Sequence, residues 1–356
     1  MGVSGCCGKR GLEEIDNNVA KIEYDNDNII TNLIEVHNKS HNSGEFENIK
    51  KLEKGSIIKK GGFGKVLKVR IEKTDEIYAL KESPINTPQN IKICVREQDI
   101  LNKCHHPNII AFKEAFKDRI VKSFYIIEEY AKGGTLREQI NRKKKIEENT
   151  LIFWLMQICL ALSYLHKKKI YHRDIKPENI LLTGTQLIKI GDFGLSKHYK
   201  SLKRKSTRVG TIHYMAPEIN SGKYDEKVDI YSLGKTFNDF LELNKNYSEE
   251  LVNLVNSFME EEPAKRPSSD QILNAPIIKE GMKGFLKKNN YENSLAKLIM
   301  KNININDNKY IKDEGEDIFI NDIKNERERL NHNYNKEKDS EDLDIIMCII
   351  KKKLNE

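Results

Sequence analysis

Residues 171–179 read YHRDIKPEN, and this stretch says more about the fold and the chemistry than any other part of the chain. It sets an acid, a lysine and an amide, Asp174, Lys176 and Asn179, at a fixed spacing. Phosphoryl transfer needs such a set, because an acid orients the attacking hydroxyl, a cation neutralises the moving phosphate and an amide oxygen suits a metal ion. The stretch therefore predicts a loop that transfers phosphate.

Two further motifs follow this loop in order. Residues 192–194 read DFG, and residues 216–218 read APE at the end of the segment beyond them. Three ordered motifs rarely coincide by chance. Over residues 46–282 the chain resembles a eukaryotic protein kinase of the Ser/Thr type, and the NIMA-related and calmodulin-dependent groups fit about equally well.

The resemblance implies an α+β fold with two lobes. A small antiparallel β lobe with one helix would span residues 46–131, and a larger, mainly α-helical lobe would span residues 132–282. Hydrophobic periodicity agrees, because it predicts strands within residues 46–83 and a strand at 124–127. It also predicts helices over 91–104, 151–166 and 228–243.

The resemblance also assigns residues to catalysis with ATP and Mg²⁺. Lys81 would contact the α and β phosphates and pair with Glu97 on the following helix. Asp192 and Asn179 would bind Mg²⁺, which prefers oxygen ligands. The residues implied as catalytic are Asp174, Lys176, Lys81 and Glu97.

A glycine-rich segment should cover the nucleotide, although it departs from the family pattern. Lys59 stands where the family has its first glycine, while Gly61 and Gly64 match the other two. Small residues there let the backbone approach phosphates closely. The residues expected to bind the nucleotide are Ile58, Gly61, Gly62, Phe63, Gly64, Val66, Ala79, Lys81, Glu129, Ala131 and Leu181.

Glu128 precedes the segment Glu129-Tyr130-Ala131 that would hold adenine, where a carboxylate is unusual. If it faces apolar surroundings, it should carry a desolvation cost or a raised pKa unless Lys81 or another donor satisfies it.

The segment between Asp192 and Glu218 contains candidate regulatory residues. By alignment Thr207 is the first candidate for activating phosphorylation and Ser206 the second, and Arg173 could pair with the added phosphate. The alternative is that these hydroxyl residues are ordinary polar loop residues.

The resemblance implies two ion contacts in the larger lobe and a substrate preference. Glu218 should pair with Arg266, and Asp229 should brace the catalytic loop. Glu178 and Asp239 align with positions that receive basic residues upstream of the phosphosite in basophilic kinases. Protein substrates with Arg or Lys before the phosphosite are therefore expected.

The N-terminus reads MGVSGCCGKR and resembles a dual-acylation signal. Myristate on Gly2 with palmitate on Cys6 or Cys7 would give two membrane anchors, whereas one acyl chain holds a protein only marginally. The site is imperfect, because Cys6 replaces the usual Ser or Thr, and the alternative is a small disordered start. Residues 1–45 would form this acylated, flexible segment.

Composition narrows the remaining possibilities. The chain has 356 residues, a net charge of +7 and six cysteines without metal-ligand spacing, and this cysteine usage favours reduced, intracellular thiols. A cytoplasmic protein is therefore expected, associated with a membrane through the N-terminal acylation. Nucleic-acid binding is not expected, because no recognition motif accompanies the charge. No transmembrane segment is expected, since the apolar stretch 151–165 is short and interrupted. Residues 283–356 form a charged extension, partly disordered or helical.

Two alternatives to a protein kinase remain. A pseudokinase scaffold would keep the fold and bind partners without catalysis, and Lys59 and Glu128 keep this reading open. A metabolic small-molecule kinase on a related fold is disfavoured by residues 216–218. The sequence does not determine the oligomeric state.

Overall fold

The computed structural model describes residues 52–53, 56–61, 64–71, 76–118, 122–198, 212–221 and 224–288. The backbone divides into two units, residues 1–56 with 69–76, and residues 57–68 with 77–356. In the first unit β1 (Leu52–Glu53) pairs antiparallel with the end of β3 (Gly64–Ile71). The residues of the candidate site that the structure describes belong to the second unit.

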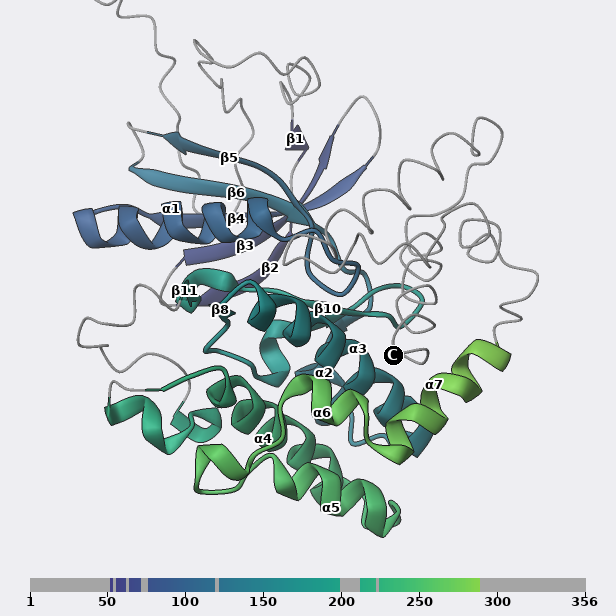
Figure 1. The fold of residues 1–356 in the computed structure, drawn as a ribbon. Coiled ribbons are helices and arrows are strands. Elements are labelled where there is room, and N and C mark those ends of the chain that lie inside the picture. The colour runs from purple at the N-terminus through teal and green to yellow at the C-terminus, as the bar shows by residue number, and fades with distance from the viewer. Residues whose placement is uncertain are drawn as a thin grey trace, which may run out of the picture. The chain divides into compact units, whose positions relative to one another are not determined.

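A β-sheet forms the smaller lobe within the second unit (Figure 1). β2 (Ile57–Gly61) forms an antiparallel hairpin with β3, which lies next to β4 (Ile77–Pro84). β6 (Ser123–Glu129) then pairs antiparallel with both β4 and β5 (Phe112–Asp118). Directly opposed residues of such a pair project from the same face, so the β4–β6 register places Lys81 beside Ile126 and Ala79 beside Glu128.

The helix of this lobe is α1 (Pro88–Lys103), which packs against β5 and β6. Thr87 caps its N-terminus by accepting a hydrogen bond from the Asn90 backbone N–H at 3.2 Å, and Pro88 provides a preset first turn. Ile100 and Leu101 are fully buried, which fixes the face of the helix that turns inward. Glu97, one turn earlier, is thereby also buried.

The larger lobe consists mainly of helices around a long central one. α3 (Glu148–Lys167) contacts α6 (Ser269–Leu273) and α7 (Pro276–Lys288). The other helices are α2 (Leu136–Asn141), α4 (Lys227–Leu243) and α5 (Glu249–Ser257).

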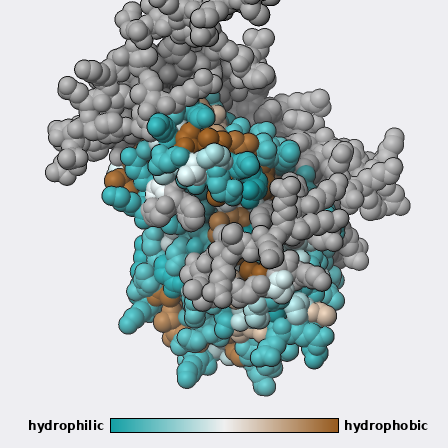
Figure 2. All heavy atoms as spheres, turned by 90° about the vertical axis from the view of Figure 1, so that its left-hand side faces the viewer, coloured by the Kyte–Doolittle hydropathy of each residue, from teal (hydrophilic) through white to brown (hydrophobic). Residues whose placement is uncertain are grey.

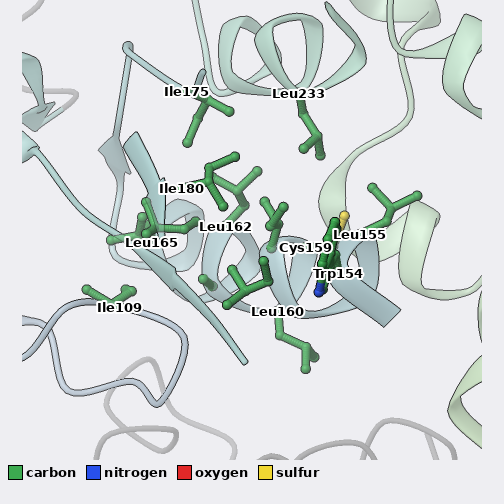
Figure 3. Packing of buried hydrophobic residues seen from close by; sticks show 14 of the residues in the cluster. Ile109, Trp154, Leu155, Cys159, Leu160, Leu162, Leu165, Ile175, Ile180 and Leu233 are labelled. Atoms are coloured by element: carbon green, nitrogen blue, oxygen red, sulfur yellow. The ribbon is translucent and has the colours of Figure 1, made fainter. Parts of the chain in front are cut away.

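The core of the larger lobe surrounds α3 and explains why this helix is apolar on all sides. The cluster contains Leu155, Cys159 and Leu162 of α3, and Leu233 of α4 and Ile180 of β9 belong to the same cluster (Figure 3). Among the described residues α3 is the one helix long and apolar enough to cross a membrane, yet 83% of its apolar window is buried inside the protein. Such burial is typical of a core helix.

Short strands frame the YHRDIKPEN loop. β8 (Ile170–Tyr171) includes the first residue of the loop and pairs with β11 (Lys197–His198). β9 (Ile180–Leu182) follows the loop and pairs with both β7 (Gly134–Thr135) and β10 (Ile188–Ile190). The loop is therefore held at both ends by backbone hydrogen bonds. Figure 2 shows that the described surface on one side of the molecule is mostly hydrophilic, with scattered hydrophobic patches.

The predicted fold class is confirmed, because an antiparallel β lobe with one helix is followed by a helical lobe. Several predictions concern residues outside the described parts of the chain. These are Gly2, Cys6, Cys7, Gly62, Phe63, Ser206, Thr207 and the segments 1–45 and 289–356.

Candidate active site

Lys81 lies between two carboxylates that come from distant parts of the chain. Its Nζ is 2.5 Å from Glu97 Oε1 and 2.9 Å from Asp192 Oδ1. β4 carries the lysine, α1 carries Glu97, and Asp192 follows β10. The ion pair between Lys81 and Glu97 that the motif order predicts is present in the structure.

The charges in this cluster shift the ionisation of its members. Burial alone would lower the pKa of Lys81, but the carboxylates of Asp192 and Glu97 together raise it well above its ordinary value. The Lys81 ammonium in turn holds the pKa of Asp192 well below its usual range, against the effect of burial. Lys81 is therefore positively charged and Asp192 negatively charged throughout the physiological pH range.

Backbone geometry brings Asp192 close to the ion pair. Asp192 has a left-handed conformation with φ of 62°, which non-glycine residues adopt mainly at functional or turn positions. Gly194 lies against the same cluster, because a Cβ on it would be 3.4 Å from both Asp192 Oδ1 and Glu97 Oε2. A side chain at position 194 would occupy the space beside both carboxylates.

The YHRDIKPEN loop gathers its three polar side chains. Lys176 Nζ donates to Asp174 Oδ2 at 2.7 Å, and Asn179 Nδ2 donates to the same oxygen at 2.8 Å. Asn179 Nδ2 also donates to the Asp174 backbone carbonyl at 2.9 Å. These contacts fix the Asp174 carboxylate and direct Asn179 Oδ1 away from it.

Asp229 of α4 holds this loop by hydrogen bonds to its backbone, as the resemblance implies. Its carboxylate accepts hydrogen bonds from the backbone N–H of His172 at 2.9 Å and of Arg173 at 2.7 Å. It also lies 3.0 Å from His166 Nε2. Burial alone would raise the pKa of Asp229, but the hydrogen bonds, first that from His166, lower it. The brace is therefore a buried carboxylate that stays ionised.

His172 connects the two loops that carry the candidate catalytic and metal-binding residues. Its Nε2 lies 3.0 Å from the carbonyl oxygen of Gly191, next to Asp192. Its backbone carbonyl accepts a hydrogen bond from Ser196 Oγ at 3.2 Å. The Gly191 N–H also donates to the Asn179 carbonyl at 2.9 Å. Asp174, Asn179 and Asp192 are thus held in one hydrogen-bonded framework.

The described residues predicted to bind the nucleotide come from several elements. Gly61 and Gly64 are paired at the end of the β2–β3 hairpin. Gly64 has φ of 132°, and a Cβ there would lie 1.9 Å from the Glu82 carbonyl oxygen, so only glycine fits. Ala79 and Ala131 are buried, whereas Ile58 is 46% exposed. Val66 and Leu181 are half-buried.

Lys59 makes a contact that its position in the sequence did not reveal. Its Nζ lies 3.4 Å from Asn179 Oδ1, so the hairpin reaches the oxygen that is predicted to bind metal. Lys59 also contributes to the low pKa of Asp192, after the larger effect of Lys81. The only signal in the sequence was the replacement of a glycine by lysine.

Glu128 and Glu129 point to opposite faces of β6, as adjacent strand residues do. Glu129 Oε2 is 3.1 Å from Lys189 Nζ and accepts from the Ala111 N–H at 3.1 Å. This buried ion pair had no signal in the sequence. Glu128 lies on the Lys81 face, where its Oε1 is buried without a hydrogen-bond partner among the described residues. Burial raises the pKa of Glu128 to about 8 even though Lys81 opposes the shift.

The raised pKa of Glu128 leads to a prediction about stability. The folded protein should hold a proton on Glu128 up to about pH 8, while the unfolded chain releases it near pH 4.5. The free energy of unfolding should therefore fall as pH rises through this window. Glu128→Gln removes the ionisation, so its melting temperature should exceed that of the wild type by about 3 °C or more at pH 8 and by little at pH 5.

Thermal unfolding across pH 5–9 measures this difference. Glu250→Gln, at an exposed position of α5, is the matched control and should follow the wild-type curve. Parallel curves for Glu128→Gln and the wild type would show that Glu128 ionises normally in the folded protein.

The side chains present fit a nucleotide with Mg²⁺. Asp192 is ionised, and Asn179 is turned so that its amide oxygen, not its nitrogen, lies on the side away from Asp174, where it accepts the 3.4 Å contact from Lys59 Nζ. A carboxylate and an amide oxygen are ligands of the kind that Mg²⁺ accepts, with phosphate oxygens and water completing its shell.

A second predicted contact anchors the APE motif. Glu218 and Arg266 form a two-pronged ion pair, with Arg266 Nη1 2.5 Å from Oε1 and Nη2 3.1 Å from Oε2. The Arg266 side chain is fully buried and also donates to the Glu260 carbonyl at 2.7 Å. Tyr231 covers its guanidinium at 4.8 Å.

Comparison with known proteins identifies the family. The model of the protein kinase domain matches residues 52–245, more than half of the chain, and the chain belongs to this family.

Individual relatives are kinases of the Ser/Thr type. The chain is 32% identical over 259 residues to serine/threonine-protein kinase Nek1 of Mus musculus, covering 64% of this chain and 21% of the relative. It is 34% identical over 245 residues to Nek3 of the same species, covering 61% and 47%. It is 31% identical over 243 residues to calcium-dependent protein kinase 4 of Plasmodium berghei, covering 65% and 44%. The matches span from about a fifth to about a half of these relatives, and both subfamily alternatives are represented.

Proposed function

We propose that the chain is an ATP- and Mg²⁺-dependent protein kinase that phosphorylates serine or threonine hydroxyls of proteins. One observation carries this proposal. Lys81, Glu97 and Asp192 form one ionic cluster, and Asp174, Lys176 and Asn179 form a second one, tied to the first through His172 and Gly191.

The roles follow from chemistry and position. Bound Mg²⁺ would neutralise phosphate charge, held by Asp192 and Asn179. Lys81, kept in place by Glu97, would bind phosphate oxygens through its ammonium. Asp174 would orient the substrate hydroxyl and accept its proton, and Lys176, already 2.7 Å from Asp174, would place positive charge beside the moving phosphoryl group.

Transfer of labelled phosphate tests the proposal. Purified protein is incubated with labelled ATP, Mg²⁺ and a general protein substrate, beside the variant Asp192→Ala. The proposal expects label on serine or threonine of the protein with the wild type alone. In a parallel incubation with small-molecule acceptors, label on such an acceptor and none on the protein substrate would identify a metabolic kinase instead.

A pseudokinase scaffold is the second candidate, and the contact of Lys59 with Asn179 Oδ1 favours it, because an ammonium there competes with a metal ion. A wild-type protein that binds nucleotide in a thermal-shift assay without any turnover would decide for the scaffold.

Phosphorylation of Thr207 or Ser206 is proposed to activate the kinase. Arg173 supports this, since its side chain is buried while Nε and Nη1 have no hydrogen-bond partner among the described residues. Burial lowers the pKa of Arg173, with Arg96 adding repulsion. A phosphate near this guanidinium would relieve that cost. Phosphatase treatment should lower the transfer rate, and an unchanged rate would refute this regulation.

Membrane attachment is proposed from the N-terminal sequence alone, through myristate on Gly2 and palmitate on Cys6 or Cys7. Mass spectrometry of the N-terminal peptide from the native cell measures it. An unmodified Gly2 would remove the basis for a cytoplasmic, membrane-associated location.

Protein substrates with basic residues before the phosphosite are proposed as well. Glu178 and Asp239 support this choice, because both are acidic and their side chains remain partly exposed, at 34% and 15%. Glu178 also directly precedes Asn179, which contacts Asp174.

A further inference from the structure

Arg137 of α2 lies between the two carboxylates proposed to receive basic substrate residues. Its Nε donates to Glu178 Oε1 at 2.7 Å, and its Nη2 lies 3.4 Å from Asp239 Oδ2. Nη2 also donates to the Tyr214 hydroxyl, which donates to Asp239 Oδ2 at 2.7 Å. The chain's own guanidinium thus makes the contacts that a substrate arginine would make.

Local structure fixes Arg137 in this place. Thr135 caps α2 by accepting from the Glu138 N–H at 3.2 Å, which sets where the helix begins. Leu136 is fully buried and Ile140 nearly so, which sets how the helix is rotated. The Arg137 side chain, 27% exposed, therefore projects towards Glu178 and α4.

The charges in this cluster do not balance. Two carboxylates face one guanidinium, which leaves one negative charge among these three side chains. His213, 66% exposed, lies 3.8 Å from Asp239. Glu178 Oε2 is buried and has no hydrogen-bond donor among the described residues. The cluster keeps a reduced attraction for one further cation, weaker than two free carboxylates would exert.

We propose that Arg137 determines substrate specificity by competing with the substrate's arginine for Glu178 and Asp239. This inference rests on the proposed kinase function and refines its substrate class. With Arg137 in place, selection of basic residues before the phosphosite is weak. Without Arg137 the two acids are released, and selection becomes strong. Internal competition of this kind is a means of setting specificity by opposing one class of ligand.

A positional peptide library with labelled ATP tests the proposal. For the wild type and for each variant, kcat/KM is measured for peptides with arginine at one upstream position and for the same peptides with alanine there. The first value is divided by the second. A general change of activity cancels in this ratio. At one or two upstream positions this ratio should be about tenfold higher in Arg137→Ala than in the wild type, because the peptide arginine gains charged hydrogen bonds to Glu178 and Asp239. Arg142→Ala, at the exposed end of the same helix, should keep the wild-type ratio.

A further substitution identifies the acids. Adding Glu178→Gln to Arg137→Ala should abolish most of the gained preference, and the gain should appear mainly in KM. Binding of a fluorescent arginine peptide to the same variants, measured by anisotropy with a non-hydrolysable ATP analogue, gives a readout without turnover. Arg137→Gln, which keeps most of the side-chain volume, replaces Arg137→Ala if the latter unfolds.

The outcomes separate this proposal from the kinase function. An unchanged ratio in a folded, active Arg137 variant overturns the role of Arg137 and leaves the kinase function standing. Absence of transfer by the wild type to every peptide and protein overturns the kinase function itself, and the anisotropy measurement still decides whether Arg137 opposes arginine binding.

Discussion

Asp192→Ala should lower phosphate transfer from ATP to protein by about a thousandfold or more. The wild-type carboxylate is held ionised by Lys81 at 2.9 Å and is the one carboxylate assigned to the metal. Alanine removes the carboxylate proposed to bind the metal, and Lys81 then has Glu97 as its one remaining partner of the two. Measured with labelled ATP, the loss should appear in kcat, because the charge is needed most in the transition state.

Nucleotide binding provides a second measurement on the same variant. The wild type should bind a non-hydrolysable ATP analogue more tightly with Mg²⁺ than without it, and Asp192→Ala should lose this difference in calorimetry. Asp99→Ala, at an exposed position of α1, controls for the loss of a carboxylate elsewhere and should behave as the wild type. A folded Asp192→Ala protein with undiminished transfer would disprove the assignment.

Glu218→Ala should destabilise the protein by about 3 kcal/mol, which corresponds to a fall of about 9 °C in melting temperature. The reason is the fully buried Arg266, whose charge would lose its carboxylate partner while remaining out of water. The hydrogen bonds to backbone carbonyls and the contact with Tyr231 would remain, but they cannot neutralise the guanidinium.

A neighbouring surface pair offers the matched control. Glu262 lies 3.1 Å from Lys265, with both side chains at least 60% exposed. Exposed pairs of this kind contribute at most about 1 kcal/mol, so Glu262→Ala should change the melting temperature by no more than about 3 °C. Equal effects of Glu218→Ala and Glu262→Ala would mean that the Arg266 contact adds little to stability.

Much of the site could be predicted because its residues stand at fixed spacings in short motifs. Asp174, Lys176 and Asn179 fall within six residues, so one loop conformation brings them together. Predicting the ion pair of Lys81 with Glu97 required the order of the motifs as well, since spacing alone does not indicate which helix residue a strand residue contacts. The predicted strands and helices were those with long hydrophobic periodicity, and β3, β4, β6, α1, α3 and α4 contain them.

The remaining features depend on contacts that no spacing encodes. Arg137, Glu178 and Asp239 come from three elements, and their meeting depends on how α2 and α4 pack. β7, β8 and β11 have two residues each, too few to show a period. α1 begins earlier than predicted, at Pro88, because Thr87 caps it ahead of the first apolar position.

One hydrophobic cluster joins the lobes and determines how the chain should unfold. It includes Ile100 and Leu101 of α1, Ile126 of β6, and residues of α3 such as Leu160. Because residues of both lobes are needed to bury this cluster, heating should unfold both lobes in a single cooperative transition. If the chain were divided after Ala131 and either fragment expressed alone, the apolar residues of the cluster in that fragment would be exposed to water. Such a fragment should aggregate.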